Sequence, residues 1–337
     1  MRILVVGGTR FIGAATVRRL HKLGHDIAVL NRGQSPATPP EGVRQIRGDR
    51  ARLGDSRSEI LDFAPDVALH TVIISDRDAE IARDAFRGIA SRWVMLSSCD
   101  VYRAYGRLTG TEPGAPDPLP LTETSPLREQ RFPYRNQFPD PQHPLHIYDK
   151  IPAEEIALGD SELQGTVLRL PMVLGPNDYQ HRLFPFLKRM DDGRPSIILE
   201  EGYADWRSTY GFVENVAECI AKACVDERAA GEIYNVADWD LSMEELVGAV
   251  GKATGWSGTI VRMPSDALPE AMRSGVDTTQ NLVISAEKIR RDLDIRPSAS
   301  LDETIRVTTE WERSNPPSPI PDGQFDYEAE DQLLARS

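Results

Sequence analysis

Residues 1–13 read Met1-Arg-Ile-Leu-Val-Val-Gly-Gly-Thr-Arg-Phe-Ile-Gly13, and this stretch decides the fold. Its apolar run at residues 3–6 predicts a buried strand, Gly7-Gly8 predicts a turn, and the periodic segment 11–23 predicts a helix. This order of elements binds the diphosphate of a dinucleotide, because glycine lets the backbone approach the anion and the amides at the helix start face it. The sequence therefore predicts a nucleotide-binding turn at its start.

Working outward, the composition is that of an ordinary globular chain. Its 337 residues are enough for one large domain or for two lobes with a sizeable core. No apolar run approaches about 18 residues, which argues against a membrane span. The formal net charge of −13 argues against broad binding to nucleic acid, which needs a basic face. We therefore expect a small-molecule substrate rather than a nucleic-acid partner.

Three cysteines, Cys99, Cys219 and Cys224, are scattered along the chain. They are too few for a disulfide framework or a zinc site, so no metal centre is predicted. No leader segment is recognisable ahead of the first predicted strand. We therefore expect a protein of the reducing cytoplasm.

Strand and helix patterns alternate along the first half of the chain and resume after an interruption. The predicted strands are residues 27–30, 43–47, 67–74, 93–96, 166–170, 197–199 and 233–236. The predicted helices after the first are residues 56–63, 76–89, 152–163, 183–190, 213–225, 242–253 and 301–311, with Ser242 and Glu245 spaced as a capping box. Repeated units at this spacing predict an α/β fold with a doubly wound parallel sheet, a Rossmann arrangement.

The same pattern predicts two lobes and a tail. Residues 1–175 should form the dinucleotide-binding domain, with its sheet completed by residues from about 210–237. Residues 176–320 should form mainly a smaller α/β substrate lobe over the strand ends, where open α/β sheets place their ligands. Residues 321–337 are predicted to be a peripheral acidic tail.

Residues 103–147 interrupt the alternation. They carry many prolines and turn residues, such as Pro113-Gly114 and Pro116-Asp-Pro118, and predict a long surface excursion with little regular structure. Loops of this length are often lids or binding loops, but a passive insertion is equally consistent with the pattern.

Basic residues bear on the choice of nucleotide. Asn31-Arg32 follows the second strand, where an acidic residue would usually bind the ribose 2′-hydroxyl, and Arg10 lies within the glycine turn. An arginine at the end of this strand can pair with a 2′-phosphate. This favours NADP over NAD, although Arg32 is also compatible with a solvated turn.

Several blocks of sequence occur in an order that resembles a known family. They are Gly7-Gly-Thr-Arg-Phe-Ile-Gly13, Gly48-Asp-Arg50, Ser97-Ser-Cys-Asp-Val-Tyr102, Lys150-Ile-Pro-Ala-Glu154, Arg169-Leu-Pro-Met-Val-Leu-Gly-Pro176 and Tyr210-Gly-Phe-Val-Glu-Asn-Val-Ala217. Together they resemble the extended short-chain dehydrogenases/reductases, the NAD-dependent epimerase/dehydratase family, over about residues 1–310. Arg10 stands where the family has a central glycine. This resembles a subgroup with a GGTRFIG-type turn that includes chloroplast stem-loop RNA-binding proteins.

The resemblance implies which residues bind the nucleotide. The phosphate turn would comprise Gly7, Thr9, Arg10, Phe11, Ile12 and Gly13. The other cofactor-binding positions would be Asn31, Arg32, Asp49, Arg50, His70, Thr71, Ser97, Lys150, Pro171 and Val173, with Asp49 and Arg50 beside the adenine and Pro171 to Val173 beside the nicotinamide. The family often forms homodimers, so a homodimer is one implied arrangement.

The resemblance also implies a catalytic set, with one departure. Ser98 would hydrogen-bond the reacting oxygen, and Lys150 would bind the nicotinamide ribose and tune a neighbouring acid. The family's acid is a tyrosine four residues before the lysine, but that position holds His146, while Tyr148 lies only two residues before Lys150. Tyr148 could act as the acid from a non-helical segment, His146 could replace it, or the site could be redox-inert.

Asp100 is a further candidate. Dehydratases of the family have a glutamate base at this point, preceded by an aspartate acid, whereas this chain has Cys99-Asp100. A thiol replaces the acid poorly, which argues against sugar 4,6-dehydration. Asp100 could bind a substrate hydroxyl, or it could cap the turn after the strand.

These features predict an NAD(P)(H)-dependent reductase or epimerase. It would transfer hydride at a carbinol or ketone carbon of a small, sugar-like metabolite, with the cofactor carrying the difficult chemistry. Two alternatives remain open at this point. One is a redox-inert dinucleotide-binding protein with an RNA-associated or regulatory role, and the other is a non-redox lyase or isomerase that uses Asp100 or His146 as its base.

Overall fold

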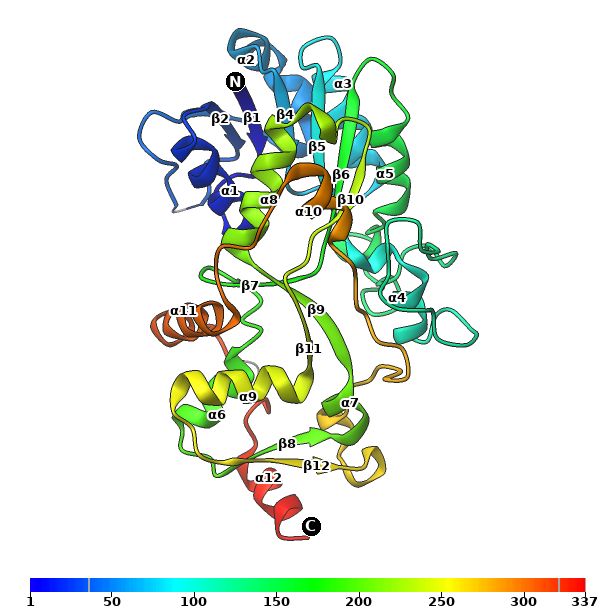
Figure 1. Ribbon diagram of the computed structural model, residues 1–337, viewed down its shortest axis with the longest axis vertical. Coiled ribbons are helices and arrows are strands. Elements are labelled where there is room, and N and C mark those ends of the chain that lie inside the picture. Colours follow the sequence, from blue (N-terminus) through cyan, green and yellow to red (C-terminus); the bar gives the residue numbers. More distant parts are fainter. Residues whose placement is uncertain (36, 321, 337) are drawn as a thin grey trace.

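The computed structural model describes residues 1–35, 37–320 and 322–336, and its main element is a parallel sheet of seven strands in the order β10-β6-β5-β4-β1-β2-β3. The strands are β1 (Arg2–Val6), β2 (Asp26–Asn31), β3 (Arg44–Arg47), β4 (Val67–His70), β5 (Arg92–Ser98), β6 (Gln164–Leu170) and β10 (Ile233–Asn235). The chain runs outward from β1 in both directions, which confirms the doubly wound Rossmann arrangement. The sheet fills the upper part of Figure 1.

Helices cover both faces of this sheet, as the apolar strands require. Along β1, Ile3 and Val5 pack with α1 (Phe11–Lys22), α8 (Val213–Val225) and α10 (Glu287–Leu293). The alternate residues Leu4 and Val6 face the core formed with α2 (Arg57–Phe63), α3 (Asp76–Phe86) and α5 (Ile151–Leu158). Strand β1 is therefore packed on both faces, and the glycine turn follows directly after its last residue, Val6.

A second lobe lies beyond the carboxyl ends of the strands, in the lower part of Figure 1. It contains a three-stranded sheet, β11-β9-β7, and a two-stranded parallel sheet, β12-β8. Its strands are β7 (Met172–Leu174), β8 (Ser196–Glu200), β9 (Arg207–Phe212), β11 (Trp239–Ser242) and β12 (Thr259–Met263), and its helices are α6 (Phe184–Asp191), α7 (Glu201–Asp205), α9 (Met243–Thr254) and α11 (Leu301–Ser314). Buried residues of these elements, including Tyr210, form a core that continues into the chain after β5, where Tyr102 and Ala104 belong to it.

The C-terminal segment ends in a helix, α12 (Tyr327–Leu334), that lies near the second lobe. Its Glu330 is only 3 % exposed and forms an ion pair with Arg189 of α6, at 2.7 Å. Phe325, just before the helix, meets the ring of Phe184 edge to face at 6.0 Å. Of the predicted tail, residues 321 and 337 lie outside the described part of the chain.

Segment 103–147 lies at the carboxyl ends of the strands (Figure 1), where Arg128 donates to the Asp100 carbonyl just after β5 and Glu123 accepts from the Asn235 amide of β10. It begins with α4 (Arg103–Leu108) and ends with the short 3₁₀ helix η3 (Pro144–His146); within the described residues, the part between them has turns and bridges but no helix or strand. The isolated bridge between Tyr102 and Leu127 ties it to the chain just after β5. None of the helices among the described residues is long and apolar enough to cross a bilayer.

Three predicted elements end three or more residues earlier in the structure than the sequence pattern indicated. The strand predicted for residues 67–74 stops at His70, because the Thr71 hydroxyl donates to the carbonyls of Val6 and Gly7 and turns the chain. The helix predicted for residues 76–89 stops at Phe86, ahead of a glycine at φ +73°. The helix predicted for residues 152–163 ends at Leu158 with Gly159 as its C-cap. Apolar side chains beyond each end had extended the predictions.

Candidate active site

The glycine turn between β1 and α1 has the shape of an anion cradle. Gly7 has φ +91°, a conformation that favours glycine. A Cβ on Gly13 would lie 2.4 Å from the Gly7 carbonyl oxygen, so only glycine fits there. The first turn of α1 has no acidic residue, and its N-cap, Arg10, makes no side-chain capping bond. The amides of the helix start are therefore left for a ligand, which is what a dinucleotide diphosphate needs.

The other residues of the turn surround this cradle. Arg10 is exposed, Thr9 and Ile12 are half-buried, and Phe11 is buried. The ring of Tyr179, on the segment after β7, meets Phe11 edge to face at 6.4 Å. Parts of both lobes thus meet at the entrance to the turn.

His70 and Thr71 lie at the end of β4, next to the turn. Burial, followed by the positive charges of Arg50 and Lys150, lowers the pKa of His70 to about 3, so its imidazole is neutral. Its Nδ1 accepts from the amide of Val72 at 3.3 Å. Its Nε2 is buried and has no hydrogen-bond partner among the residues that the structure describes. A buried polar atom of this kind, beside the cradle, is consistent with a ligand group.

The ends of β2 and β3 frame the far side of the cradle. The side chain of Asn31 accepts from the amide of Gly33 at 2.7 Å, and Arg32 is exposed. Asp49 accepts from the amide of Ala51 at 3.0 Å and caps the 3₁₀ helix η1 (Arg50–Ser56). The side chains of two predicted cofactor residues, Asn31 and Asp49, thus accept hydrogen bonds from main-chain amides of their own turns.

Arg50 is held in an ion pair rather than projecting freely. It pairs with Asp78 at 2.7 Å and donates to the Val72 carbonyl at 3.1 Å. Its charge still acts on His70 at the end of β4. The predicted adenine-side residue is therefore fixed beside the strand ends by α3.

Two of the predicted catalytic residues, Ser98 and Asp100, lie at the end of β5 and directly after it. Ser98 ends the strand, and its hydroxyl accepts from the amide of Asp100 at 3.3 Å in the 3₁₀ helix η2 (Cys99–Val101). Asp100 is 5 % exposed, and its Oδ2 accepts from the Tyr148 hydroxyl at 2.8 Å. Burial, and then the charge of Asp100, raise the pKa of Tyr148 well above its ordinary value, while a hydrogen bond with Ser98 acts in the opposite direction. Ser98, Asp100 and Tyr148 thus form one cluster.

Lys150 joins this cluster from the start of α5. It is the N-cap of the helix, so Tyr148 and Lys150 lie in a non-helical approach and their two-residue spacing does not turn them apart. The Lys150 ammonium lies 5.7 Å from the centre of the Tyr148 ring and donates to the Leu96 carbonyl at 2.8 Å. Burial lowers the pKa of Lys150 to about 8.

His146 lies elsewhere. Its Nδ1 is 2.9 Å from the carbonyl oxygen of Phe138, within segment 103–147, and its own carbonyl accepts from Arg135. The structure therefore brings Tyr148, and not His146, to Asp100. Cys99 is buried, and burial raises its pKa to about 12, so its thiol stays neutral.

The remaining predicted cofactor residues lie at or beyond the ends of β5 and β6. The Ser97 hydroxyl donates to Glu154, which is in turn bound by Arg169 at 2.7 Å. Pro171 is buried, and Val173 is 3 % exposed in the core formed with α8. Ser97 is therefore tied into a buried ion pair on the side of the strand opposite to Ser98.

Tyr134 is a member of the cluster that the sequence patterns did not single out. Its hydroxyl donates to Asp100 Oδ2 at 3.0 Å, and its ring meets that of Tyr148 edge to face at 5.1 Å. It comes from segment 103–147, which has no helical or strand periodicity that would show where its side chains point. The only signal was an aromatic residue among prolines and arginines.

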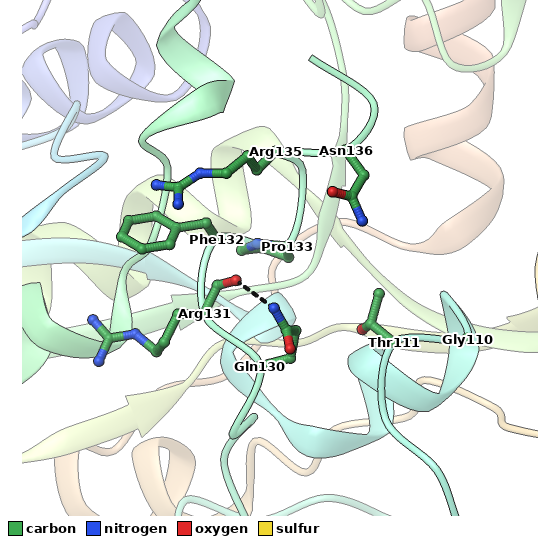
Figure 2. A pocket seen from close by; sticks show the side chains of 8 residues that line it. All are labelled: Gly110, Thr111, Gln130, Arg131, Phe132, Pro133, Arg135 and Asn136. Atoms are coloured by element: carbon green, nitrogen blue, oxygen red, sulfur yellow. Dashed lines mark hydrogen bonds between the residues drawn. The ribbon is translucent and has the colours of Figure 1, made fainter. Parts of the chain in front are cut away.

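The residues beside Tyr134 line a hollow of about 380 Å³, formed by Gly110, Thr111, Gln130, Arg131, Phe132, Pro133, Arg135 and Asn136. Figure 2 shows the guanidinium groups of Arg131 and Arg135 on either side of the Phe132 ring, pointing away from Thr111. Arg135 lies 3.6 Å from the ring centre. This packing gives the segment a defined shape at its closest approach to the cluster.

Asp149 fastens segment 103–147 to the cluster. It is 1 % exposed, and one oxygen accepts from Arg131 and from the amide of Phe132, the latter at 3.2 Å. The other oxygen accepts from Arg128 at 3.5 Å and from the amide of Ile151 at 3.2 Å. Because Asp149 lies between Tyr148 and Lys150, the segment that carries Tyr134 is anchored within the site itself.

Comparison with known proteins defines the class. A family model, "NAD dependent epimerase/dehydratase family", matches residues 3–237, and the chain belongs to this family of short-chain dehydrogenase/reductase enzymes. The chain is 26 % identical over 283 residues to 2'-dehydrokanamycin reductase of Streptomyces kanamyceticus, covering 81 % of this chain and 72 % of the relative. It is 29 % identical over 276 residues to 2-alkyl-3-oxoalkanoate reductase of Stenotrophomonas maltophilia, covering 76 % of each.

A solved structure supports the fold. UDP-glucose 4-epimerase of Thermus thermophilus in complex with NAD superposes with a TM-score of 0.66 at 23 % identity, covering 94 % of this chain and all of the other. The Rossmann fold is thus shown. The GGTRFIG-type subgroup is not established by these comparisons.

Proposed function

We propose that this protein is an NAD(P)(H)-dependent reductase or epimerase that acts on a carbinol or ketone carbon of a small, sugar-like metabolite. One observation carries the proposal: Ser98, Tyr148 and Lys150 meet at the carboxyl end of β5, on the same edge of the sheet as the glycine turn. The hydride donor and the groups that handle the substrate oxygen are then on one side of the sheet, as open α/β folds require.

Each residue of the cluster has its own role in the proposed reaction. A bound nicotinamide supplies or accepts the hydride. The hydroxyls of Ser98 and Tyr148 hold the substrate oxygen between them, and Tyr148 exchanges the proton. Lys150 holds the nicotinamide ribose and adds positive charge near the developing oxyanion. The glycine turn binds the diphosphate through the amides of α1.

NADP is the proposed nucleotide. Residues 31–35 contain no carboxylate that could bind the ribose 2′-hydroxyl, and Arg32 is exposed at the end of β2. Asn31 is aligned with Arg47 on β3, and a Cβ built on Gly33 would lie 3.0 Å from Arg47 Nε. Two guanidinium groups, those of Arg32 and Arg47, are therefore available beside this turn for a 2′-phosphate.

The test begins with nucleotide binding to the ligand-free protein. Fluorescence titration should show tighter binding of NADPH than of NADH. The variant Arg32→Ala should lose about tenfold in affinity for NADPH and little for NADH, because one charge-assisted contact is removed. Lys252→Ala, which changes an exposed cation on α9, is the matched control. Equal binding of the two nucleotides, unaffected by Arg32→Ala, would contradict the NADP assignment.

The chemistry is tested with a panel drawn from the substrates that the relatives' names give. The panel contains 2′-dehydrokanamycin, a 2-alkyl-3-oxoalkanoate, UDP-glucose and dTDP-glucose. Net reduction would change nicotinamide absorbance, whereas epimerisation would invert the configuration at the reacting carbon, return a deuterium label to that same carbon and cause no net absorbance change. Tyr148→Phe should reduce turnover by roughly 100-fold or more. A protein that binds neither nucleotide and turns over no member of the panel would sink the proposal.

A further inference from the structure

One oxygen of the Asp100 carboxylate accepts hydrogen bonds from two tyrosine hydroxyls. Tyr148 donates to Oδ2 at 2.8 Å from the start of α5, and Tyr134 donates to the same atom at 3.0 Å from segment 103–147. The other oxygen, Oδ1, is buried and has no hydrogen-bond partner among the residues that the structure describes. Two separate parts of the chain therefore converge on one oxygen of a carboxylate that has a spare acceptor.

The charged groups around Asp100 leave its carboxylate without a direct cation among the described residues. Arg128 donates to the main-chain carbonyl of Asp100 and not to the side chain. The Lys150 ammonium donates to the Leu96 carbonyl, although its charge is felt at Asp100. The remaining titratable groups that face the carboxylate are Cys99 and Tyr105, together with the two phenols; burial raises the pKa of Cys99 and of Tyr105 to about 12, so both are neutral.

Tyr148 is poorly suited to be the resting base. Burial and the negative charge of Asp100 raise its pKa well above the ordinary value, and the same two causes raise the pKa of Tyr134. Phenolate at Tyr148 would place a second negative charge within hydrogen-bond distance of Asp100, in a site of low dielectric. Because the Tyr148 hydroxyl already donates to Asp100 Oδ2, a proton that Tyr148 takes from a carbinol can be passed on to that oxygen.

We propose that Asp100 accepts this proton through Tyr148, and that Tyr134 is a positioning residue that holds the carboxylate for the relay. The inference rests on the proposed function and adds a residue from the inserted segment to it. In the oxidation direction the carbinol O–H bond breaks and its proton goes to the Tyr148 oxygen, while the Tyr148 proton passes to Asp100 Oδ2. The carbinol C–H bond breaks at the same time, and its electron pair leaves with the hydrogen as hydride to an oxidised nicotinamide nucleotide. The substrate becomes the ketone, and Asp100 becomes a neutral acid.

The reverse reaction uses the same atoms. Protonated Asp100 returns its proton to Tyr148 as Tyr148 protonates the carbonyl oxygen, so no isolated phenolate forms. Oxidation then needs ionised Asp100 and should weaken as pH falls, whereas reduction needs protonated Asp100 and should weaken as pH rises. A site that used phenolate as its resting base would place the change at the ionisation of the tyrosine instead.

Two variants test the relay with the panel member that the wild type turns over fastest. Asp100→Asn keeps an oxygen that can accept from both phenols but cannot take up the proton, so turnover should fall by roughly 100-fold or more while NADPH affinity is retained. Tyr134→Phe removes one of the two donors that stabilise the carboxylate. The midpoint of the rate–pH profile should therefore move upward by about one pH unit, with the plateau rate nearly unchanged.

The matched control is Tyr203→Phe, which removes a phenol that is also partly buried but stacks on Trp206 in the second lobe. Its rate–pH profile should stay where the wild-type profile is. Full turnover in Asp100→Asn would overturn the relay, as would a Tyr134→Phe profile that coincides with that of the Tyr203→Phe control. Inactivity of the wild type on the whole panel would instead defeat the proposed function and the relay with it.

A titration without substrate gives an independent readout. The ultraviolet difference absorbance of phenolate follows tyrosine ionisation in the ligand-free protein. Replacing Asp100 by asparagine removes the neighbouring negative charge, so ionisation of Tyr134 and Tyr148 should begin at lower pH than in the wild type. Superimposable titration curves would show that the carboxylate does not control these phenols and would overturn the proposal.

Discussion

Two buried carboxylates, Glu154 and Asp100, lie near the carboxyl end of β5 and are held in opposite ways. Glu154 is 3 % exposed, and both of its oxygens accept from the guanidinium of Arg169, at 2.7 to 3.2 Å. Asp100 is similarly buried, but its oxygens meet two phenols and, on one side, no partner among the described residues. A buried charge with a matched counter-charge is suited to hold structure, and one held by neutral donors is suited to exchange a proton.

The two cations near these carboxylates, Arg169 and Lys150, are also held in different ways. Arg169 also donates to the Tyr102 hydroxyl and the Glu123 carbonyl, each at 3.1 Å, and its contacts with Glu154 hold its pKa above the ordinary range. The Lys150 ammonium donates to the main-chain carbonyl of Leu96, and burial lowers its pKa. The strand end thus separates the Glu154–Arg169 ion pair on one side from the proposed proton relay of Asp100 and Tyr148 on the other.

The largest expected effect comes from breaking the structural pair. Arg169→Met leaves Glu154 as a buried charge without its partner and should lower the free energy of unfolding by about 3–5 kcal/mol. Urea denaturation of the purified protein measures it. The double variant Glu154→Gln with Arg169→Met should recover much of the loss, because neither charge is then buried alone. A loss below about 1 kcal/mol in the single variant would show that this pair is not structural.

An intermediate effect should appear in the pH dependence of stability. The pKa of Lys150 is about 8 in the folded protein and 10.5 ordinarily, so between these values the unfolded chain binds a proton that the folded protein lacks. The free energy of unfolding of the wild type, relative to Lys150→Met, should therefore rise with pH across this window and level off above it. Denaturation at a series of pH values measures the difference, with the exposed Lys252→Met as a control that should stay flat. A difference that falls with pH would contradict the buried, weakly paired lysine.

The smallest expected effect is on the other carboxylate. Asp100→Asn retains an acceptor for both phenols, so the free energy of unfolding should change by no more than about 1 kcal/mol. Thermal and urea denaturation measure it alongside Arg169→Met. If the two variants lose comparable stability, Asp100 belongs with Glu154 as a structural residue, and the contrast between the two sides of β5 disappears.

Local patterns predicted the parts of this molecule that short stretches of sequence determine. The strand, glycine turn and helix of residues 1–13 are contiguous, so their order was enough to predict the cradle. Ser242 and Glu245 lie three residues apart, and the structure has the capping box that this spacing predicts. The family resemblance predicted Ser98 and Lys150 as catalytic residues. In the structure Ser98 lies at the end of β5 and Lys150 at the start of α5.

The rest depended on contacts between distant segments. Spacing on a regular helix would have turned Tyr148 away from Lys150, but the helix begins only at Ile151, and both side chains reach the cluster. Tyr134 reaches Asp100 from 34 residues away, through a segment without periodicity that Asp149 anchors. No pattern in residues 103–147 shows which side chains point inward, so the choice between a lid and a passive insertion could not be made from sequence.

The helix α12 has a consequence for how the protein is handled in the laboratory. Arg189 of α6 and Arg194, just beyond it, both have Glu330 as an ion-pair partner, at 2.7 and 3.9 Å, and Arg194 also pairs with Asp331. A truncation from Phe325 onward, made for crystallisation, would remove the acidic partners of these two arginines. It would also remove the ring that packs on Phe184. An affinity tag should therefore be placed where it leaves this carboxyl-terminal helix docked.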